Sequence, residues 1–177
     1  FTIDPGSAEV SLAGLTITKG AAVAAPEFNG GGIVFRGDGI LTIEGCRVTG
    51  NQCGFGGGGI RHEGSGTLRV VASEIANNYA GYGGGGLFNS NGALEVIDSI
   101  VSGNHSDLLG GGIYSNQGAT VKSSTIAENT SGTFGGGILA NLGDFHIINS
   151  TIALNESATR GGGIASHLFY VVRVDLV

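Results

Sequence analysis

The residues of this chain that could do chemistry are few and spread along its length. The four histidines are His62, His105, His146 and His167. None of them lies in a Cys/His cluster with metal-ligand spacing, and none has a nucleophile beside it at an obvious repeat position. His62 next to Glu63, and His105 two residues before Asp107, are expected to be solvated turn residues. We therefore predict no catalytic residues and no metal site.

Two pairs of opposite charges recur at a fixed separation. Arg47 and Glu74 lie 27 residues apart, and Arg69 and Glu95 lie 26 residues apart. If this separation brings equivalent positions of a repeat side by side, each pair forms a cross-strand ion pair worth a fraction of a kcal/mol. These pairs are predicted to be structural.

Large apolar residues recur just before short runs of glycine. The aromatic members are predicted as candidate ligand-binding residues: Phe28, Phe55, Tyr82 and Phe134. With Leu108 they would form a nearly continuous column. An exposed column would be a flat strip suited to sugar rings, whereas a buried column would be an aromatic stack at a corner of the fold. Both interpretations remain open at this point.

The element that must position these residues is an internal repeat. Three glycines followed by an aliphatic residue occur six times, at intervals of 25–27 residues, and end at Ile33, Ile60, Leu87, Ile113, Ile138 and Ile164. A phosphate-binding glycine loop would need a following helix, which the sequence does not indicate. The triplets therefore predict a corner too tight for a Cβ atom.

A second motif has the same period: a small residue, then an aliphatic residue two positions later, then an asparagine three positions after that, as in Ser73, Ile75 and Asn78. Its asparagines are Asn51, Asn78, Asn104, Asn129 and Asn155. Asparagine tolerates left-handed backbone geometry, and its amide can bond to the same residue one coil along. We predict a structural ladder of these five side chains at one corner.

Alternating triplets such as Leu41-Thr42-Ile43 and Leu68-Arg69-Val70 lie between the motifs and indicate short strands with one buried face. About three such strands per repeat, stacked in parallel roughly 4.8 Å apart, predict an all-β fold: a right-handed parallel β-helix, or solenoid, of about six coils of 25–27 residues. Residues 1–177 should form a single β-helix domain. Its open ends suggest part of a longer solenoid or an end-stacking subunit.

Composition excludes several function classes. Eight scattered Lys and Arg and a net charge of −6 provide no basic stripe for nucleic acid. No run of 18 apolar residues exists, so we predict no transmembrane segment. Cys46 and Cys53 fit either a short-loop disulfide or two free thiols. No cofactor is predicted. Calcium binding would be expected only from the extracellular β-helix class, because no motif in this sequence supports it.

The repeats resemble those of bacterial surface proteins. Gly-Gly-Gly-Ile with small-x-Ile-x-x-Asn is similar to the right-handed β-helix repeats of polymorphic outer-membrane autotransporters, which carry Gly-Gly-Ala-Ile and Phe-x-x-Asn. This chain has Ile or Val where those proteins usually have Phe, and a third Gly in place of Ala. The resemblance implies a secreted or cell-surface location and a stalk or display role.

Two functions are therefore expected from the sequence. The first is a non-catalytic extracellular β-helix scaffold, an adhesin or a fibre-forming surface protein, with self-association through the open solenoid ends and cell-surface glycans as partners. The alternative is a carbohydrate-binding or polysaccharide-degrading β-helix protein; such an enzyme would be a polysaccharide lyase or glycoside hydrolase.

Overall fold

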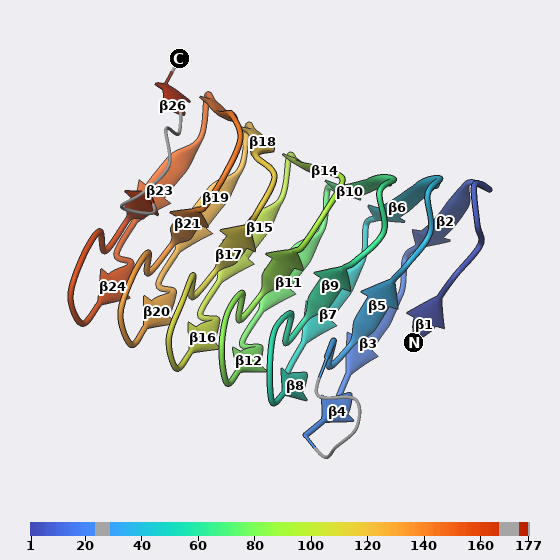
Figure 1. Cartoon of the computed structure of the whole chain (residues 1–177), viewed down its shortest axis with the longest axis horizontal. Helices are drawn as coiled ribbons and strands as arrows, with labels where there is room; N and C mark the ends of the chain where they lie inside the picture. The colour runs from blue at the N-terminus through green and yellow to red at the C-terminus, as the bar shows by residue number, and fades with distance from the viewer. Residues whose placement is uncertain (24–28, 167–173, 177) are drawn as a thin grey trace.

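The structure, a computed structural model, describes residues 1–23, 29–166 and 174–176. These residues form an all-β, right-handed parallel solenoid, which confirms the predicted fold class. Figure 1 shows the coils stacked side by side along the long axis of the molecule, with the first and last described strands at opposite ends of the stack. The aliphatic residues that follow the glycine triplets, from Ile33 to Ile164, pair with one another across five complete turns. The prediction of about six coils was therefore slightly high.

Four parallel sheets run along the stack, one more than the three strands per repeat that were predicted. Sheet A contains β1 (Thr2–Ile3), β5 (Ile33–Phe35), β9 (Ile60–His62), β13 (Leu87–Asn89), β17 (Ile113–Ser115), β21 (Ile138–Ala140) and β25 (Ile164–Ser166). Sheet B contains β2 (Val10–Ala13), β6 (Ile40–Glu44), β10 (Thr67–Val71), β14 (Ala93–Ile97), β18 (Ala119–Lys122), β22 (Phe145–Ile148) and β26 (Val174–Leu176).

The other two sheets follow in each coil. Sheet C contains β3 (Thr16–Thr18), β7 (Arg47–Thr49), β11 (Glu74–Ala76), β15 (Ile100–Ser102), β19 (Thr125–Ala127) and β23 (Thr151–Ala153). Sheet D contains β4 (Ala21–Ala22), β8 (Gln52–Cys53), β12 (Tyr79–Ala80), β16 (His105–Ser106), β20 (Thr130–Ser131) and β24 (Glu156–Ser157). The strands of sheet D are two residues long, too short to produce a visible hydrophobic alternation.

The interior is a set of apolar columns that run from coil to coil. The aliphatic residue after each glycine triplet is fully buried from Ile33 to Ile138, and it stacks on its equivalent in the next coil. The inward residues of sheets B and C form parallel columns beside it. Each buried Ile or Leu contributes about 1.5–3 kcal/mol relative to exposure, so the stacked coils supply a core that one coil alone lacks.

The five asparagines form a hydrogen-bonded ladder at the corner between sheets C and D. In each step the backbone N–H and the Nδ2–H of one asparagine donate to the Oδ1 of the next; for Asn78 and Asn104 both distances are 3.0 Å. The second N–H of Nδ2 donates to a carbonyl of the preceding coil, such as Val48 O at 2.9 Å from Asn78. Each interior amide thus uses both donors and both acceptor sites.

The left-handed backbone at this corner belongs to a different residue from the one expected. Positive φ angles occur at the residue before each ladder asparagine, for example Asn77 at 54° and Glu128 at 57°. The asparagines are therefore selected for their side-chain amides, and the preceding position absorbs the turn.

A second ladder, not predicted, occupies the corner between sheets B and C. The backbone N–H of Ser73 donates to Ser99 Oγ at 3.1 Å, and Ser99 N–H donates to Ser124 Oγ at the same distance. Cys46 stands at this position in its coil, and its backbone N–H donates to Ser73 Oγ at 3.0 Å. The small first residue of the second motif is therefore a polar rung.

The glycine triplets form the tight corner that was predicted. The first glycine of each triplet has a positive φ, such as 57° at Gly110. A Cβ atom on the second glycine, Gly111, would overlap the carbonyl oxygen of Thr130. The chain therefore returns from sheet D to sheet A in close backbone contact.

Candidate functional site

The outward face of sheet D carries the best-defined group of polar and aromatic side chains among the described residues. The residue after each ladder asparagine points outward on this sheet, which places Gln52, Tyr79, His105, Thr130 and Glu156 in one column. The ladder fixes the backbone of every member at the preceding residue. Side chains one coil apart therefore meet in a defined register.

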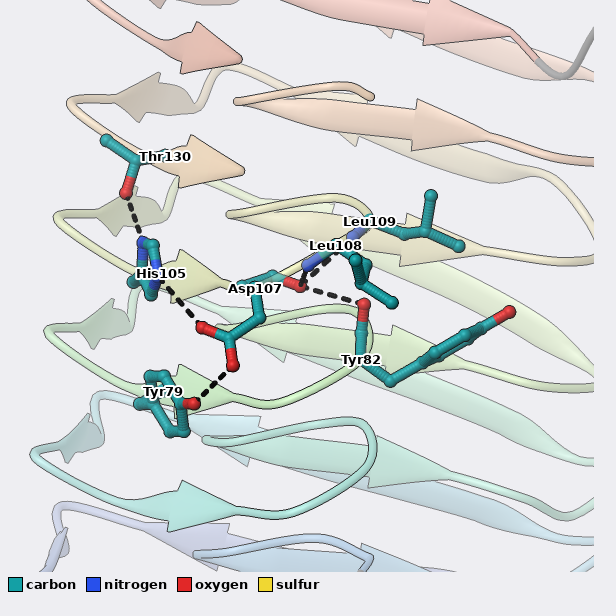
Figure 2. Close-up of polar contacts among 8 residues, drawn as sticks. Tyr79, Tyr82, His105, Asp107, Leu108, Leu109 and Thr130 are labelled. Carbon is teal, nitrogen blue, oxygen red and sulfur yellow. Dashed lines mark hydrogen bonds and ion pairs between the residues drawn. The ribbon is translucent and has the colours of Figure 1, made fainter. Parts of the chain in front are cut away.

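A carboxylate joins two members of this column, Tyr79 and His105, and a third member, Thr130, contacts His105 (Figure 2). The Tyr79 hydroxyl donates to Asp107 Oδ2 at 2.6 Å, and His105 Nε2 lies 3.3 Å from Asp107 Oδ1. His105 Nδ1 lies 2.7 Å from Thr130 Oγ1. The rings of Tyr79 and His105 are stacked, with centroids 5.7 Å apart and an interplanar angle of 18°. We refer to Tyr79, His105, Asp107 and Thr130 as the sheet D network.

The network is exposed to solvent, and hydrogen bonds between its members fix their side chains. The side chains of His105 and Asp107 are 47% and 50% exposed. The hydrogen bond to Asp107, together with partial burial and the charge of that carboxylate, raises the pKa of Tyr79 above its usual value. Tyr79 therefore remains a hydrogen-bond donor at neutral pH, and Asp107 accepts from both of its neighbours.

An apolar strip borders the network where sheet D turns toward the glycine corner. The rings of Phe55 and Tyr82 are stacked almost parallel, with centroids 4.6 Å apart and an angle of 5°. Phe55 and Leu108 are 40% and 41% exposed. Ser106 fixes this turn, because its Oγ donates to Tyr82 O and accepts from the N–H groups of Leu108 and Leu109. We refer to Phe55, Tyr82 and Leu108 as the apolar strip.

The predicted aromatic column is only partly one column. Phe134 pairs with Leu109 rather than Leu108, so it lies one position nearer the glycine triplet than Phe55 and Tyr82 do. Tyr82 and Phe134 are half-buried and pack against an outer cluster of Phe88, Tyr114, Leu139 and Ala165. Phe28 lies outside the described residues. The column is therefore exposed at Phe55 and Leu108 and partly buried at Tyr82 and Phe134.

A buried arginine supports one end of the apolar strip. The Arg61 guanidinium lies 4.5 Å from the ring centroid of Phe88 and 5.4 Å from that of Phe55. Its Nε is 2.5 Å from Glu63 Oε1, and Glu63 also binds Arg36 at 2.8 Å. Cation–π contact and charge pairing together anchor the Phe55 ring.

The structure corrects two expectations about the histidines. His62 is fully buried on the inner side of β9 and stacks on Phe35, with ring centroids 5.0 Å apart, so its prediction as a solvated residue was wrong. His105 is exposed as expected, but it does meet a hydroxyl, because Thr130 lies one coil away. His146 lies on sheet B in register with Thr120, and His167 lies outside the described residues.

The predicted ion pairs are confirmed. Arg47 Nε lies 2.9 Å from Glu74 Oε2, and Arg69 Nε lies 2.7 Å from Glu95 Oε2. All four side chains are at least partly exposed, so each pair stabilises the fold by roughly 0.2–1 kcal/mol.

The described part of the chain contains no group of three or more His, Cys, Asp or Glu side chains placed to share a metal ion. Cys46 and Cys53 are buried free thiols, and burial raises the pKa of Cys53. A buried thiol of this kind is poorly suited to nucleophilic attack. Within the same residues, no helix has the length and apolar character needed to cross a bilayer.

The sheet D network could have been found from the sequence by one further step. Tyr79, His105 and Thr130 each follow a ladder asparagine directly. The period that predicts the asparagine ladder therefore also predicts that these three residues are neighbours. Asp107 was harder to place, because it joins the column from the turn two residues beyond His105.

Comparison with known families gives one match. The family described as right handed beta helix region matches residues 3–168, nearly the whole chain. No curated protein and no solved structure matches. The parallel sheets, the ladders and the family match agree, and the chain belongs to the right-handed β-helix family.

Proposed function

We propose that this chain is a scaffold segment of a secreted or cell-surface protein, and that its sheet D face is an adhesive surface for glycans. The β-helix family supports the scaffold role, and the repeats' resemblance to bacterial surface proteins supports the location. The observation that carries the adhesive role is the row of stacked rings and fixed polar groups, exposed or half-buried, on sheet D and its turn. It has the composition of a sugar-binding surface.

The apolar strip can supply the stacking half of such a surface. The C–H groups of sugar rings pack on apolar surface, and the stacked rings of Phe55 and Tyr82, together with the exposed Leu108, present a continuous apolar surface across neighbouring coils. The spacing between coils is roughly 4.8 Å. A linear glycan lying along the solenoid axis would therefore meet an equivalent position at each coil.

The sheet D network can supply the polar half. Asp107 is oriented by Tyr79 and His105, so its carboxylate needs little reorganisation to accept hydrogen bonds from sugar hydroxyls. Gln52, also exposed on this face, adds an amide donor and acceptor. Fixed polar groups beside an apolar platform are what orient a ligand at a binding surface.

Glycan binding can be tested by retention of the purified chain on a panel of neutral and acidic polysaccharides. We expect Phe55→Ala and Tyr79→Ala to weaken retention about tenfold each, equivalent to roughly 1.4 kcal/mol. The matched control is Ile100→Ala, because Ile100 is also an exposed apolar residue, 48% exposed, but lies on sheet C. Equal retention of all three variants, or retention on no polymer, would contradict the proposal.

The same experiment separates binding from polysaccharide degradation. Release of shortened products would support the alternative of a lyase or hydrolase over an adhesive scaffold. Intact polymer after prolonged incubation, together with retention, would support adhesion alone.

Fibre formation is proposed as a second property of the scaffold. It is favoured by the parallel edges at β3 and β4 and at β23 and β24, where each strand pairs with one other strand among the residues that the structure describes. Unpaired strand edges are templates for addition of further strands.

A further inference from the structure

The sheet D network contains a hydroxyl, an imidazole and a carboxylate in line. Thr130 Oγ1 lies 2.7 Å from His105 Nδ1, and His105 Nε2 lies 3.3 Å from Asp107 Oδ1. Figure 2 shows the three side chains in succession across two neighbouring coils, with Tyr79 binding the same carboxylate from the coil on the other side. Glycan adhesion does not require this order of groups.

The polarity of the line follows from what each group can donate. An ionised Asp107 only accepts hydrogen bonds, so a neutral His105 must place its proton on Nε2. Nδ1 is then an acceptor, and the Thr130 hydroxyl must donate to it. This arrangement, a hydroxyl donating to an imidazole whose other nitrogen is held by a carboxylate, is the one that activates a hydroxyl as a nucleophile.

The surroundings leave the hydroxyl approachable and the imidazole oriented. Thr130 is half-buried and His105 is exposed, so a small substrate can reach Oγ1 from solvent. The Tyr79 ring supports one face of His105 by stacking. Leu108 follows Asp107 in the chain and is 41% exposed, so the turn beside the network also offers an apolar side chain.

We propose that Thr130 is an acyl-accepting nucleophile, with His105 as its general base and Asp107 as the residue that positions His105, and that the substrates are carboxylic esters. Thr130 Oγ1 attacks the ester carbonyl carbon while its proton passes to His105 Nδ1. The bond from that carbon to the leaving alkoxide or aryloxide breaks, and His105 returns the proton to the leaving oxygen. Water then attacks the carbonyl carbon of the acyl-threonine and gives a proton to Nδ1. The bond from that carbon to Thr130 Oγ1 breaks, His105 returns the proton to Oγ1, and the carboxylic acid is released.

The expected rate of ester hydrolysis by Thr130 is modest. The backbone N–H groups of Thr130 and Gly132 already donate to Asn104 O and Ser106 O, so the developing oxyanion is stabilised mainly by water. General-base assistance contributes about 10²–10⁴-fold. Esters with good leaving groups should therefore react first.

The test uses p-nitrophenyl acetate and the whole chain. We expect p-nitrophenol release to fall at least tenfold in Thr130→Val, which keeps the β-branched shape and removes the hydroxyl, and in His105→Gln. Thr130→Ser should retain the reaction. The matched control is Thr125→Val, because Thr125 is a half-buried threonine on the neighbouring sheet C. Circular dichroism and thermal unfolding check that each variant folds.

Mapping of the acyl group and a second pair of variants complete the test. Mass spectrometry should find the acetyl group on Thr130, and Asp107→Asn should slow acetylation while Asp107→Glu restores it. Equal release from the parent and Thr130→Val, or acetyl groups only on His105, Lys19, Lys122 or the amino terminus, would overturn the proposal. Glycan retention is measured separately, so either proposal can fail without the other.

Discussion

His62 shows how strongly one coil position can change the chemistry of a side chain. It occupies the inward position that Phe35 occupies one coil earlier, and the two rings stack. Neither ring nitrogen of His62 has a hydrogen-bond partner among the described residues. Burial lowers the pKa of His62 to about 4, an effect that the nearby Asn89 side chain only partly offsets. The neighbouring charges, Arg61 and Glu63, are paired with each other.

This burial predicts a loss of stability in mild acid. The pKa of His62 is near 6.5 in the unfolded chain and about 4 when folded, so the unfolded state binds more protons between these values. The free energy of unfolding should therefore be fully present above pH 6.5 and decrease by about 3 kcal/mol as the pH falls toward 4. Urea unfolding at a series of pH values measures this loss. The His62→Phe variant, which copies Phe35, should remove most of it.

If the His62→Phe variant loses as much stability between pH 6.5 and 4 as the parent chain, the acid sensitivity has another source. The Gln52→Ala variant, an exposed change on sheet D that removes no titratable group, provides the control and should keep the pH dependence of the parent chain.

At the scale of the elements, the two ladders hold the corners on either side of sheet C. The asparagine ladder is buried from Asn51 to Asn129, and the serine ladder is buried from Ser73 to Ser124. Buried amides and hydroxyls stabilise a fold only when their hydrogen-bond partners are present, and each rung of these ladders provides the acceptor for its neighbour. A break in one rung therefore leaves polar groups unpaired on the coil before it.

The Asn104→Ala variant tests this dependence. It would leave the backbone N–H and one Nδ2–H of Asn78 without their acceptor in a buried site. We expect a loss of about 2–4 kcal/mol in the free energy of unfolding, since each unsatisfied buried group costs about 1–3 kcal/mol. Gln52→Ala, a polar but exposed change on sheet D, should cost less than about 0.5 kcal/mol. Similar midpoints for both variants in urea unfolding would contradict this view of the ladder.

The elements were largely predictable because the repeat forces equivalent residues into register. The glycine corner, the inward aliphatic columns and the ion pair of Arg69 with Glu95 all follow from the period. From Ile33 onward, the length variation between coils lies in the turn from sheet A to sheet B: the step from His62 to Leu68 is six residues, and the step from Ser115 to Ala119 is four. In the first coil the connection from sheet D to sheet A is also longer, with 11 residues from Ala22 to Ile33 against seven from Cys53 to Ile60.

What the repeat could not predict depends on contacts specific to one coil. His62 interrupts an apolar column with a polar side chain, so its type suggested solvent although its position is inside. The sheet D network depends on Asp107, which has no equivalent acid in the adjacent coils, where Gly81 and Gly132 hold that position. Phe134 lies outside the column of Phe55 and Tyr82 because Thr133 occupies that place in its coil.

At the scale of the whole molecule, the fold is a stack of coils in which neighbours supply nearly all the contacts. Stability in such a stack is approximately a sum of coil and interface terms, so adding an interface at an open edge lowers the free energy of the coil that gains it. Further coils of the same solenoid or a second copy of the chain would satisfy such an edge equally well in chemical terms.

Sedimentation velocity over a hundredfold range of concentration tests assembly by copies of this chain. We expect the sedimentation coefficient and the frictional ratio to rise together with concentration, because rods joined end to end become more elongated. A single species of constant size over the whole range would count against fibre formation by this chain.

The asparagine ladder also gives the molecule a direction. Every rung from Asn51 to Asn129 sends its backbone N–H and one amide N–H toward the C-terminal neighbour, and every acceptor Oδ1 faces the N-terminal neighbour. The two ends of the row are therefore unlike: Asn155 would continue it as a donor, whereas in the first coil Gly20 occupies the ladder position and its backbone N–H donates to Asn51 Oδ1 at 2.9 Å. Any coil or copy that extends this row must join head to tail, so the contact is heterologous and does not close on itself. An assembly built in this way is a polar filament whose two tips differ, with growth at each tip governed by a different set of hydrogen-bonding groups.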